Sequence, residues 1–192
     1  MYRCFSNRQV EIGESLIIDE YNHIVNVLRM TPGQELELAS DNGVFLCFIE
    51  SIDGEVKVKV KEDIGMDNES PIKIHLYQAL AKGDKLEYVI KKSVELGVNQ
   101  ITPIEAKRCV VKLQGNKKVK KVERYNTISE SAAKQSKRDF IPRVNSILDI
   151  DSVPCENLLV AYEKEGAGLK DTLKNFKGKE LSILIGPEGG LG

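Results

Sequence analysis

The sequence predicts an α/β protein in two parts: a small N-terminal β-barrel over residues 1–70 and a C-terminal α/β domain over residues 71–192. Two observations predict this division. The first part holds short runs of alternating apolar and polar residues separated by turn signals, which is typical of small barrels. In the second part, apolar strand-like runs alternate with amphipathic segments, which indicates a parallel sheet with helices on both faces.

The barrel is predicted from its strand patterns. Residues 36–38 form a short alternating run, and residues 44–52 are mostly apolar. Residues 55–61 alternate strictly, which puts valines on one face of a strand and charges on the other. Between the last two runs, Asp53-Gly54 favours a hairpin turn.

A linker and a helix follow the barrel. Residues 62–71 lose periodicity and carry turn-forming residues, so they predict the boundary between the domains. Residues 72–77 predict a strand, and residues 84–96 predict an amphipathic helix. Asp84 is expected to cap that helix, with Glu87 three residues later completing a capping box.

The rest of the C-terminal domain repeats this rhythm. Residues 101–104 predict a short strand, which Pro103 assigns to an edge or an end of the sheet. A long basic helix is predicted over residues 117–138. The remaining elements are a strand at 158–161, a helix at 169–176 and a strand at 181–185.

Composition excludes several classes of protein. The chain has 192 residues with 30% charged and 41% hydrophobic residues, the values of an ordinary globular protein. No apolar run approaches the roughly 18 residues of a membrane span, and the N-terminus lacks a signal-peptide pattern, so a cytoplasmic location without a membrane partner is expected. The four cysteines and two histidines show no metal-ligand spacing, which predicts buried free thiols and no metal.

Charge is distributed unevenly along the chain. Residues 1–72 carry 6 lysines and arginines against 14 acidic residues, whereas residues 107–143 carry 12 against 3. The basic block is a candidate phosphate-binding surface. A solvated helix face explains the same charges, and charge alone favours that explanation.

A glycine-rich turn, Gly186-Pro187-Glu188-Gly189-Gly190, follows the last predicted strand. Ligands bind at such carboxyl ends of strands in α/β folds. The turn has neither P-loop nor dinucleotide-binding spacing, and read locally a simple tight turn is as good an explanation as a ligand loop.

Two cations stand at the ends of predicted helices. Lys82 precedes one helix and is positioned to help its N-terminus hold a phosphate, although this segment alone favours an ordinary capped helix. Arg138 ends the basic helix, where it serves either phosphate binding or the helix dipole.

Several segments together resemble one family, the ribosomal RNA small-subunit methyltransferase E family of the knotted SPOUT class. No single segment is decisive, but their order and spacing are specific to that family. The matching segments are Arg3 with Phe5, HIVNVLRM with Gly33, QALAKGDKLE, KKSVELGV, ITP, RCVVK, QSKR with Pro142, and IGPEGG.

The resemblance implies an N-terminal PUA-like β-barrel that helps to hold RNA. It also implies a homodimeric C-terminal SPOUT domain with a trefoil knot that binds S-adenosylmethionine. The implied activity is methylation of N3 of a uridine in 16S rRNA of the small ribosomal subunit. A third cofactor loop of the family is expected beyond Gly192, so the knot is expected to be incomplete and cofactor binding by this chain weak or absent.

The resemblance also implies site residues. The main catalytic candidates, for stabilising the uracil anion, are Arg138 and then Gln135. Contacts with the RNA backbone are expected from Arg29, Lys82, Arg108 and Lys112. The cofactor-binding candidates are Tyr162, Gly186, Pro187, Glu188, Gly189 and Gly190.

Two other functions remain open from the sequence. A SPOUT enzyme that methylates a ribose 2′-hydroxyl typically carries an Asn-x-Gly motif where this chain has residues 81–85, AKGDK, which argues against it. A non-catalytic RNA-binding module fits the barrel and the basic block, but it leaves the glycine-rich turn without a purpose.

Overall fold

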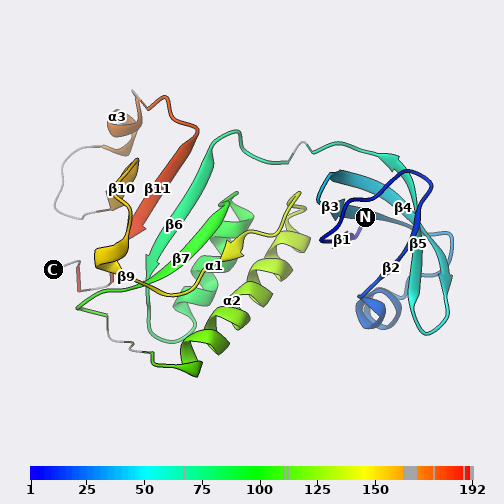
Figure 1. Cartoon of the computed structure of the whole chain (residues 1–192), viewed down its shortest axis with the longest axis horizontal. Coiled ribbons are helices and arrows are strands. Elements are labelled where there is room, and N and C mark those ends of the chain that lie inside the picture. The colour runs from blue at the N-terminus through cyan, green and yellow to red at the C-terminus, as the bar shows by residue number, and fades with distance from the viewer. Residues whose placement is uncertain are drawn as a thin grey trace. The chain divides into compact units, whose positions relative to one another are not determined.

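The chain forms two compact units (Figure 1). The computed structural model describes residues 1–66, 68–109, 111, 113–161, 168–174, 176–187 and 189–190. The first unit contains Met1–Glu69 together with Lys134–Phe140, and the second contains Ser70–Ala133 and Ile141–Gly192. The chain therefore returns to the first unit at the end of its long helix. The first unit is thus built from two separate segments of the chain, not from one continuous segment.

The first unit is a curled five-stranded sheet in the order β1-β3-β4-β5-β2. Strand β1 runs parallel to β3, and the other neighbouring pairs are antiparallel. Its strands are β1 (Arg3–Phe5), β2 (Ser15–Ile18), β3 (Glu35–Ser40), β4 (Gly43–Ile52) and β5 (Val56–Asp63).

The alternating pattern of β5 explains how this sheet builds its core. Val56, Val58 and Val60 are buried on one face, in a cluster that includes residues of all five strands. The predicted turn joins β4 to β5, and Gly54 has φ +69°, a conformation that favours glycine. A π-helical segment, η1 (Asn22–Val27), adds the buried Ile24 to the same core.

The second unit contains a parallel sheet, which confirms the parallel sheet predicted for this part. Its order is β10-β11-β6-β7-β8, and β9 also pairs with β7. The strands are β6 (Lys73–Ala79), β7 (Gln100–Glu105), β8 (Arg143–Val144), β9 (Leu148–Asp149), β10 (Leu158–Ala161) and β11 (Glu180–Ile185).

The helices of the chain are α1 (Lys85–Glu95), α2 (Asn116–Gln135) and α3 (Leu169–Leu173), with a 3₁₀ turn η2 (Ile150–Ser152). Helix α1 buries one face through Leu86, Ile90 and Val94, as its periodicity predicts. No helix among the described residues is long and apolar enough to cross a membrane.

The predicted capping box of α1 is wrong. The Asp84 side chain makes no capping hydrogen bond. The Glu87 carboxylate instead accepts from Lys121 Nζ at 3.1 Å and from Arg124 Nη2 at 2.7 Å, both on α2. Charged donors bind a carboxylate more strongly than a single backbone N–H does, so Glu87 joins the two helices.

The prediction that Pro103 lies at an edge or end of the sheet is also wrong, because β7 has neighbours on both sides. On one side it pairs with β6 along its length. On the other side it pairs with β8 at residues 100–101 and with β9 at residues 104–105. Pro103, which has no N–H to donate, falls in the gap between these two short strands.

The cysteines are all unpaired thiols. Cys4, Cys47 and Cys109 are buried, as predicted, but Cys155 is exposed. Cys155 lies in the turn region before β10 rather than in a strand, so no packed element covers it.

Candidate active site

Three loops gather at the carboxyl edge of the parallel sheet. Strand β11 pairs with β6 up to Ile185 and Gln78, so the glycine-rich turn begins beside Ala79. Strand β6 pairs with β7 up to Ala79 and Ile104, and Leu80 N–H extends the ladder to the Ile104 carbonyl at 2.9 Å. The segments after β6, β7 and β11 therefore leave the sheet next to one another, where α/β folds bind ligands.

The glycine-rich turn presents backbone at this edge. Gly190 has φ +77° and its N–H donates to the Pro187 carbonyl at 2.9 Å, which closes the turn. Gly189 is exposed, and Ile185 just before the turn is half-buried. Accessible backbone beside an apolar side chain suits a nucleoside, whose flat ring needs apolar contact and whose polar edge needs hydrogen bonds. Tyr162 and Glu188 lie outside the described residues.

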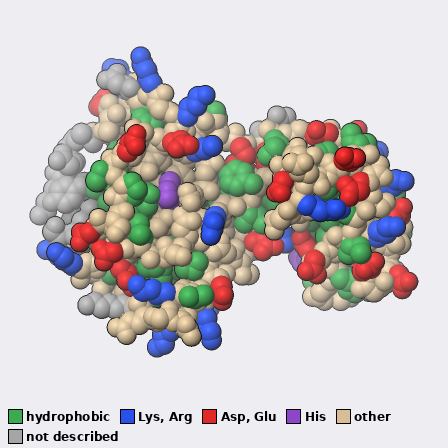
Figure 2. All heavy atoms as spheres, viewed as in Figure 1, with side chains coloured by type: hydrophobic (Ala, Val, Ile, Leu, Met, Phe, Trp, Pro, Cys, Tyr) green, Lys and Arg blue, Asp and Glu red, His purple; other side chains and the backbone are tan. Residues whose placement is uncertain are grey.

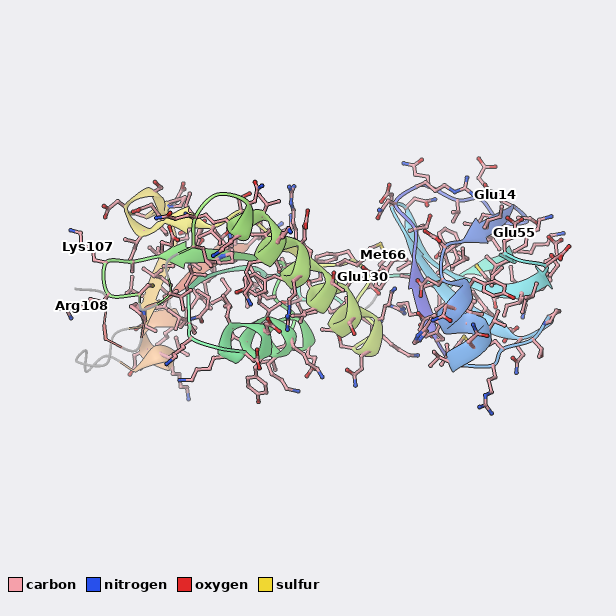
Figure 3. The ribbon with its side chains drawn as sticks, turned by 90° about the horizontal axis from the view of Figure 1, so that it is seen from below. Glu14, Glu55, Met66, Lys107, Arg108 and Glu130 are labelled. Carbon is pink, nitrogen blue, oxygen red and sulfur yellow. The ribbon has the colours of Figure 1, made fainter. Side chains whose placement is uncertain are left out.

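Arg108 contacts this turn directly. Its Nη1 donates to the Gly189 carbonyl at 2.8 Å. Arg108 and its neighbour Lys107 both project from the loop after β7, as Figure 3 shows. Lys112, the other predicted RNA contact in this region, falls in a gap between the described residues.

Two further predicted RNA contacts are exposed. Lys82 lies in the segment between β6 and α1, at the same carboxyl edge as the glycine-rich turn. Arg29 belongs to the first unit, where it follows η1 with φ +55°. Arg29 has no ion pair with any described residue.

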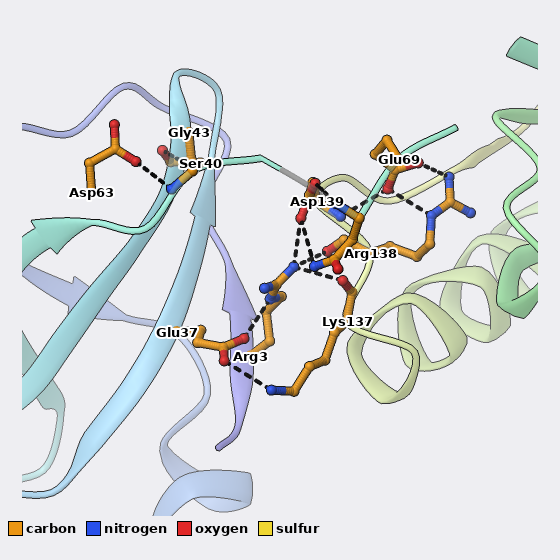
Figure 4. Close-up of polar contacts among 11 residues, drawn as sticks. Arg3, Glu37, Ser40, Gly43, Asp63, Glu69, Lys137, Arg138 and Asp139 are labelled. Carbon is orange, nitrogen blue, oxygen red and sulfur yellow. Dashed lines mark hydrogen bonds and ion pairs between the residues drawn. The ribbon is translucent and has the colours of Figure 1, made fainter. Parts of the chain in front are cut away.

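The two catalytic candidates differ sharply in burial. Gln135 is exposed at the last residue of α2, whereas Arg138 is only 3% exposed. The Arg138 guanidinium donates to both carboxylate oxygens of Glu69, from Nε at 2.7 Å and from Nη2 at 2.6 Å (Figure 4). It also lies over the Phe140 ring, 4.9 Å from its centre. A two-point ion pair of this kind fixes the guanidinium firmly.

A second buried arginine holds the segment that carries Arg138 (Figure 4). Arg3, 4% exposed, donates from Nη1 to Asp139 Oδ1 at 2.8 Å and to the Lys137 carbonyl at 2.7 Å. Its Nε donates to Glu37 Oε2 at 2.8 Å, and Lys137 Nζ pairs with Glu37 Oε1 at 2.9 Å. Burial alone would raise the pKa of Glu37, but the hydrogen bonds from Lys137 and Arg3 outweigh burial and hold that pKa below its usual range.

Sequence reasoning missed the acidic partners in this cluster. Glu69 accepts from the Arg138 side chain and from the Asp139 N–H, 70 positions along the chain, whereas the Asp139 carboxylate accepts from Arg3. The acidic excess of the first 72 residues, which include Glu69 but not Asp139, is a sequence signal for the Glu69 contact alone.

The basic block is partly neutralised within the second unit. Glu105 pairs with Lys118 at 2.6 Å, and Glu87 forms ion pairs with two more cations of α2, Lys121 and Arg124. Figure 2 shows acidic and basic side chains interspersed on the visible face. Exposed cations of the block that form no ion pair with described residues are Lys107, Arg108, Lys117, Lys120 and Arg143.

Comparisons with known proteins identify the family. Residues 68–192 match the model of an RNA methyltransferase domain, and residues 19–62 match that of an RNA methyltransferase PUA domain. The ribosomal RNA small subunit methyltransferase E of Bacillus subtilis is 36% identical over 97% of this chain and 78% of its own length. The enzyme of the same name from Mesomycoplasma hyopneumoniae is 30% identical, over 99% of this chain and 82% of its own.

A solved structure agrees with these sequence matches. The ribosomal RNA small subunit methyltransferase E of Neisseria gonorrhoeae, crystallised bound to S-adenosyl methionine, matches the fold with a TM-score of 0.85 at 28% identity. The match covers 100% of this chain and 82% of that one. With both domain models, the relatives and the fold in agreement, the chain belongs to the ribosomal RNA small subunit methyltransferase E family.

Proposed function

We propose that this protein binds S-adenosylmethionine and methylates N3 of a uridine in 16S rRNA of the small ribosomal subunit. The observation that carries the proposal is the gathering of three loops at one carboxyl edge of the sheet, with the glycine-rich turn among them. Membership of an RNA methyltransferase family supports it, as does the S-adenosyl methionine bound by the Neisseria gonorrhoeae relative.

The cofactor site is proposed at the glycine-rich turn. Backbone groups of Gly186, Pro187, Gly189 and Gly190 hold the nucleoside end, and Tyr162 and Glu188 complete the site. The cofactor supplies an electrophilic methyl group on a sulfonium. The protein's task is to fix that group's direction, and a turn closed by its own hydrogen bond suits this task because it loses little freedom on binding.

RNA binding is proposed to use cations of both units. Arg29 on the first unit and Lys82 and Lys112 on the second contact phosphates, which supplies affinity but no sequence preference. The family model that matches residues 19–62 is a PUA domain, consistent with an RNA-holding role for the first unit. The target uridine is turned out of its stack so that N3 can be reached.

The reaction requires N3 to lose its proton, because the protonated nitrogen is a poor nucleophile. Arg138 and Gln135 are proposed to stabilise the negative charge that then develops on the uracil. The Arg138 guanidinium is engaged by Glu69 in the structure. The proposal therefore includes an exchange in which the uracil replaces Glu69 as the partner of Arg138.

The assembly and location follow from the substrate and the family resemblance. We propose a homodimer, and we place the protein in the cytoplasm, where bacterial ribosomes are made. Light scattering of the purified full-length protein tests the dimer.

Mass spectrometry of 16S rRNA from a deletion strain tests the activity. We expect the loss of one base-methylated uridine, restored when the gene is returned on a plasmid. Loss of a ribose methylation instead would assign the chain to the 2′-O class, and an unchanged methylation pattern would assign it to non-catalytic RNA binding.

A further inference from the structure

The loop after β7 has an internal anchor that aims Arg108. Cys109 N–H donates to the Ala106 carbonyl at 2.9 Å, and the Cys109 sulfur accepts from Ala106 N–H at 3.3 Å. Cys109 is 6% exposed, so the thiol holds the turn from inside the protein. Arg108, next to this anchor, starts from a fixed backbone position although its side chain is exposed.

From that position the Arg108 side chain runs along the glycine-rich turn. Its Nη1 donates to the Gly189 carbonyl at 2.8 Å. A Cβ atom added at Gly189 would lie 3.7 Å from the Arg108 Cβ and 3.8 Å from its Cδ, so the aliphatic part of the side chain packs beside the turn. Both the charged and the apolar parts of Arg108 therefore contact the loop proposed to bind the cofactor.

A side chain that binds RNA phosphate is expected to have a different environment from that of Arg108. A phosphate-binding cation points outward and needs no fixed partner, as with the neighbouring Lys107, which is exposed and makes no hydrogen bond with a described residue. Arg108 instead donates one of its N–H groups to a backbone carbonyl of its own chain. Because Gly189 and Gly190 have no side chains to restrict them, this external contact adds to the turn's own hydrogen bond in limiting their backbone.

We propose that Arg108 is a positioning residue for cofactor binding, which holds the Gly186–Gly190 turn in its binding shape through the Gly189 carbonyl. The inference rests on the proposed function of this turn. Arg108 then acts mainly on the affinity for S-adenosylmethionine and only weakly on the affinity for RNA.

Calorimetry with S-adenosylmethionine on the full-length protein tests this role, using Arg108→Ala with Lys107→Ala as the matched control. We expect about fivefold to tenfold weaker binding for Arg108→Ala, the loss of one solvent-exposed hydrogen bond. Lys107→Ala should bind like the wild type. Arg108→Lys, which keeps a single donor, should recover part of the affinity. In turnover assays, KM for the cofactor should rise while kcat at saturation stays within about twofold.

Wild-type cofactor affinity in Arg108→Ala, with weaker RNA binding and a salt slope reduced by about one, would overturn the proposal and assign Arg108 to phosphate. A readout without cofactor separates this inference from the proposed function. Hydrogen exchange at the turn amides should be faster in Arg108→Ala than in the wild type and in Lys107→Ala. Equal exchange rates overturn the positioning role, whereas wild-type protein that binds no S-adenosylmethionine overturns the proposed function instead.

Discussion

At the scale of single residues, two arginines of the first unit are almost fully buried. Arg3 forms ion pairs with Glu37 and Asp139, and Arg138 forms one with Glu69. A buried guanidinium is tolerated only when its donors are paired, and removing one partner leaves an uncompensated charge. Each of these acidic residues therefore supplies oxygen acceptors that its arginine needs in the folded protein.

The catalytic role of Arg138 can be separated from its structural role. Arg138→Ala alone leaves the partly buried Glu69 without its partner, so we compare Glu69→Gln with the double variant Glu69→Gln, Arg138→Met. We expect Glu69→Gln to keep turnover, and the double variant to lose about a hundredfold in kcat while still binding S-adenosylmethionine, as for loss of one group that stabilises developing charge. Turnover is measured with 16S rRNA at a temperature where both variants are folded. Equal turnover of the two variants would show that Arg138 has only a structural role.

Glu37 makes stability depend on pH in a defined direction. Its pKa in the folded protein is lowered, so its contribution is present above the ordinary carboxyl pKa of about 4.3 and is lost as the pH falls through the lower folded value. We expect the free energy of unfolding, from urea titrations between about pH 3 and pH 7, to fall less steeply on acidification in Glu37→Gln than in the wild type. Glu55→Gln, which neutralises an exposed carboxylate, should keep the wild-type slope. Identical slopes in all three proteins would contradict this assignment.

The cysteines should differ in reactivity. Burial raises the pKa of the Cys47 thiol to about 12 and that of Cys4 well above its usual value, and the reactive thiolate is rare in both. Cys155 is exposed. In native protein at about pH 8, we expect iodoacetamide to label Cys155 first, with the other three labelled at comparable rates only after unfolding. Mass spectrometry of timed samples checks this, and fast native labelling of Cys47 would show that the first unit opens readily.

At the scale of elements, α1 and α2 are joined through one carboxylate. Glu87 binds Lys121 and Arg124, although Arg124 is 61% exposed and its share is weakened by water. The sequence predicted both helices and the buried face of α1, since these depend on local periodicity. It assigned Glu87 to a cap because a local pattern cannot reveal a partner 34 or 37 positions away.

Neutralising Glu87 should therefore loosen the contact between these helices. We expect Glu87→Gln to lower the free energy of unfolding by about 1 kcal/mol. Glu123→Gln, an exposed carboxylate on α2 that forms no ion pair with described residues, should change it by less than about 0.5 kcal/mol. Chemical denaturation measures both, and equal effects would argue against Glu87 as the joining residue.

The candidate site shows the same limit of sequence reasoning. The carboxyl edge and the glycine-rich turn were predictable, because a strand pattern and a turn pattern are adjacent in the chain. The bond from Arg108 to Gly189 was not, since it joins positions 81 residues apart through a backbone carbonyl that has no sequence signal. The sequence identified Arg108 only as a candidate cation for RNA binding, and the structure shows that its partner is the Gly189 carbonyl.

At the scale of the whole molecule, the first unit takes back a segment from beyond α2. A helix was predicted through residue 138, but α2 ends at Gln135 and Lys137 has φ +54°, rare for a residue other than glycine. Arg3 and Asp139, which hold this conformation, lie 136 positions apart. No local sequence pattern predicts that Lys134–Phe140 belongs to the first unit.

A fragment of residues 1–69 should be less stable than the same unit in the whole chain. It lacks Asp139 and the Lys137 carbonyl, which leaves Arg3 with fewer acceptors. We expect Arg3→Met to cost about 3 kcal/mol in the whole chain and clearly less in the fragment. Urea denaturation of the four proteins measures the difference, and equal costs would show that Lys134–Phe140 contributes nothing to Arg3.

The return of Lys134–Phe140 also matters while the protein is being made. The ribosome releases Arg3 and the first-unit strands early, but Asp139 only after β6, α1, β7 and α2 have been synthesised. At about 5–20 residues per second, this interval lasts on the order of several seconds. During that time the nascent N-terminal unit carries an arginine without its final partners, which makes it a target for chaperones and proteases until the segment after α2 has been translated.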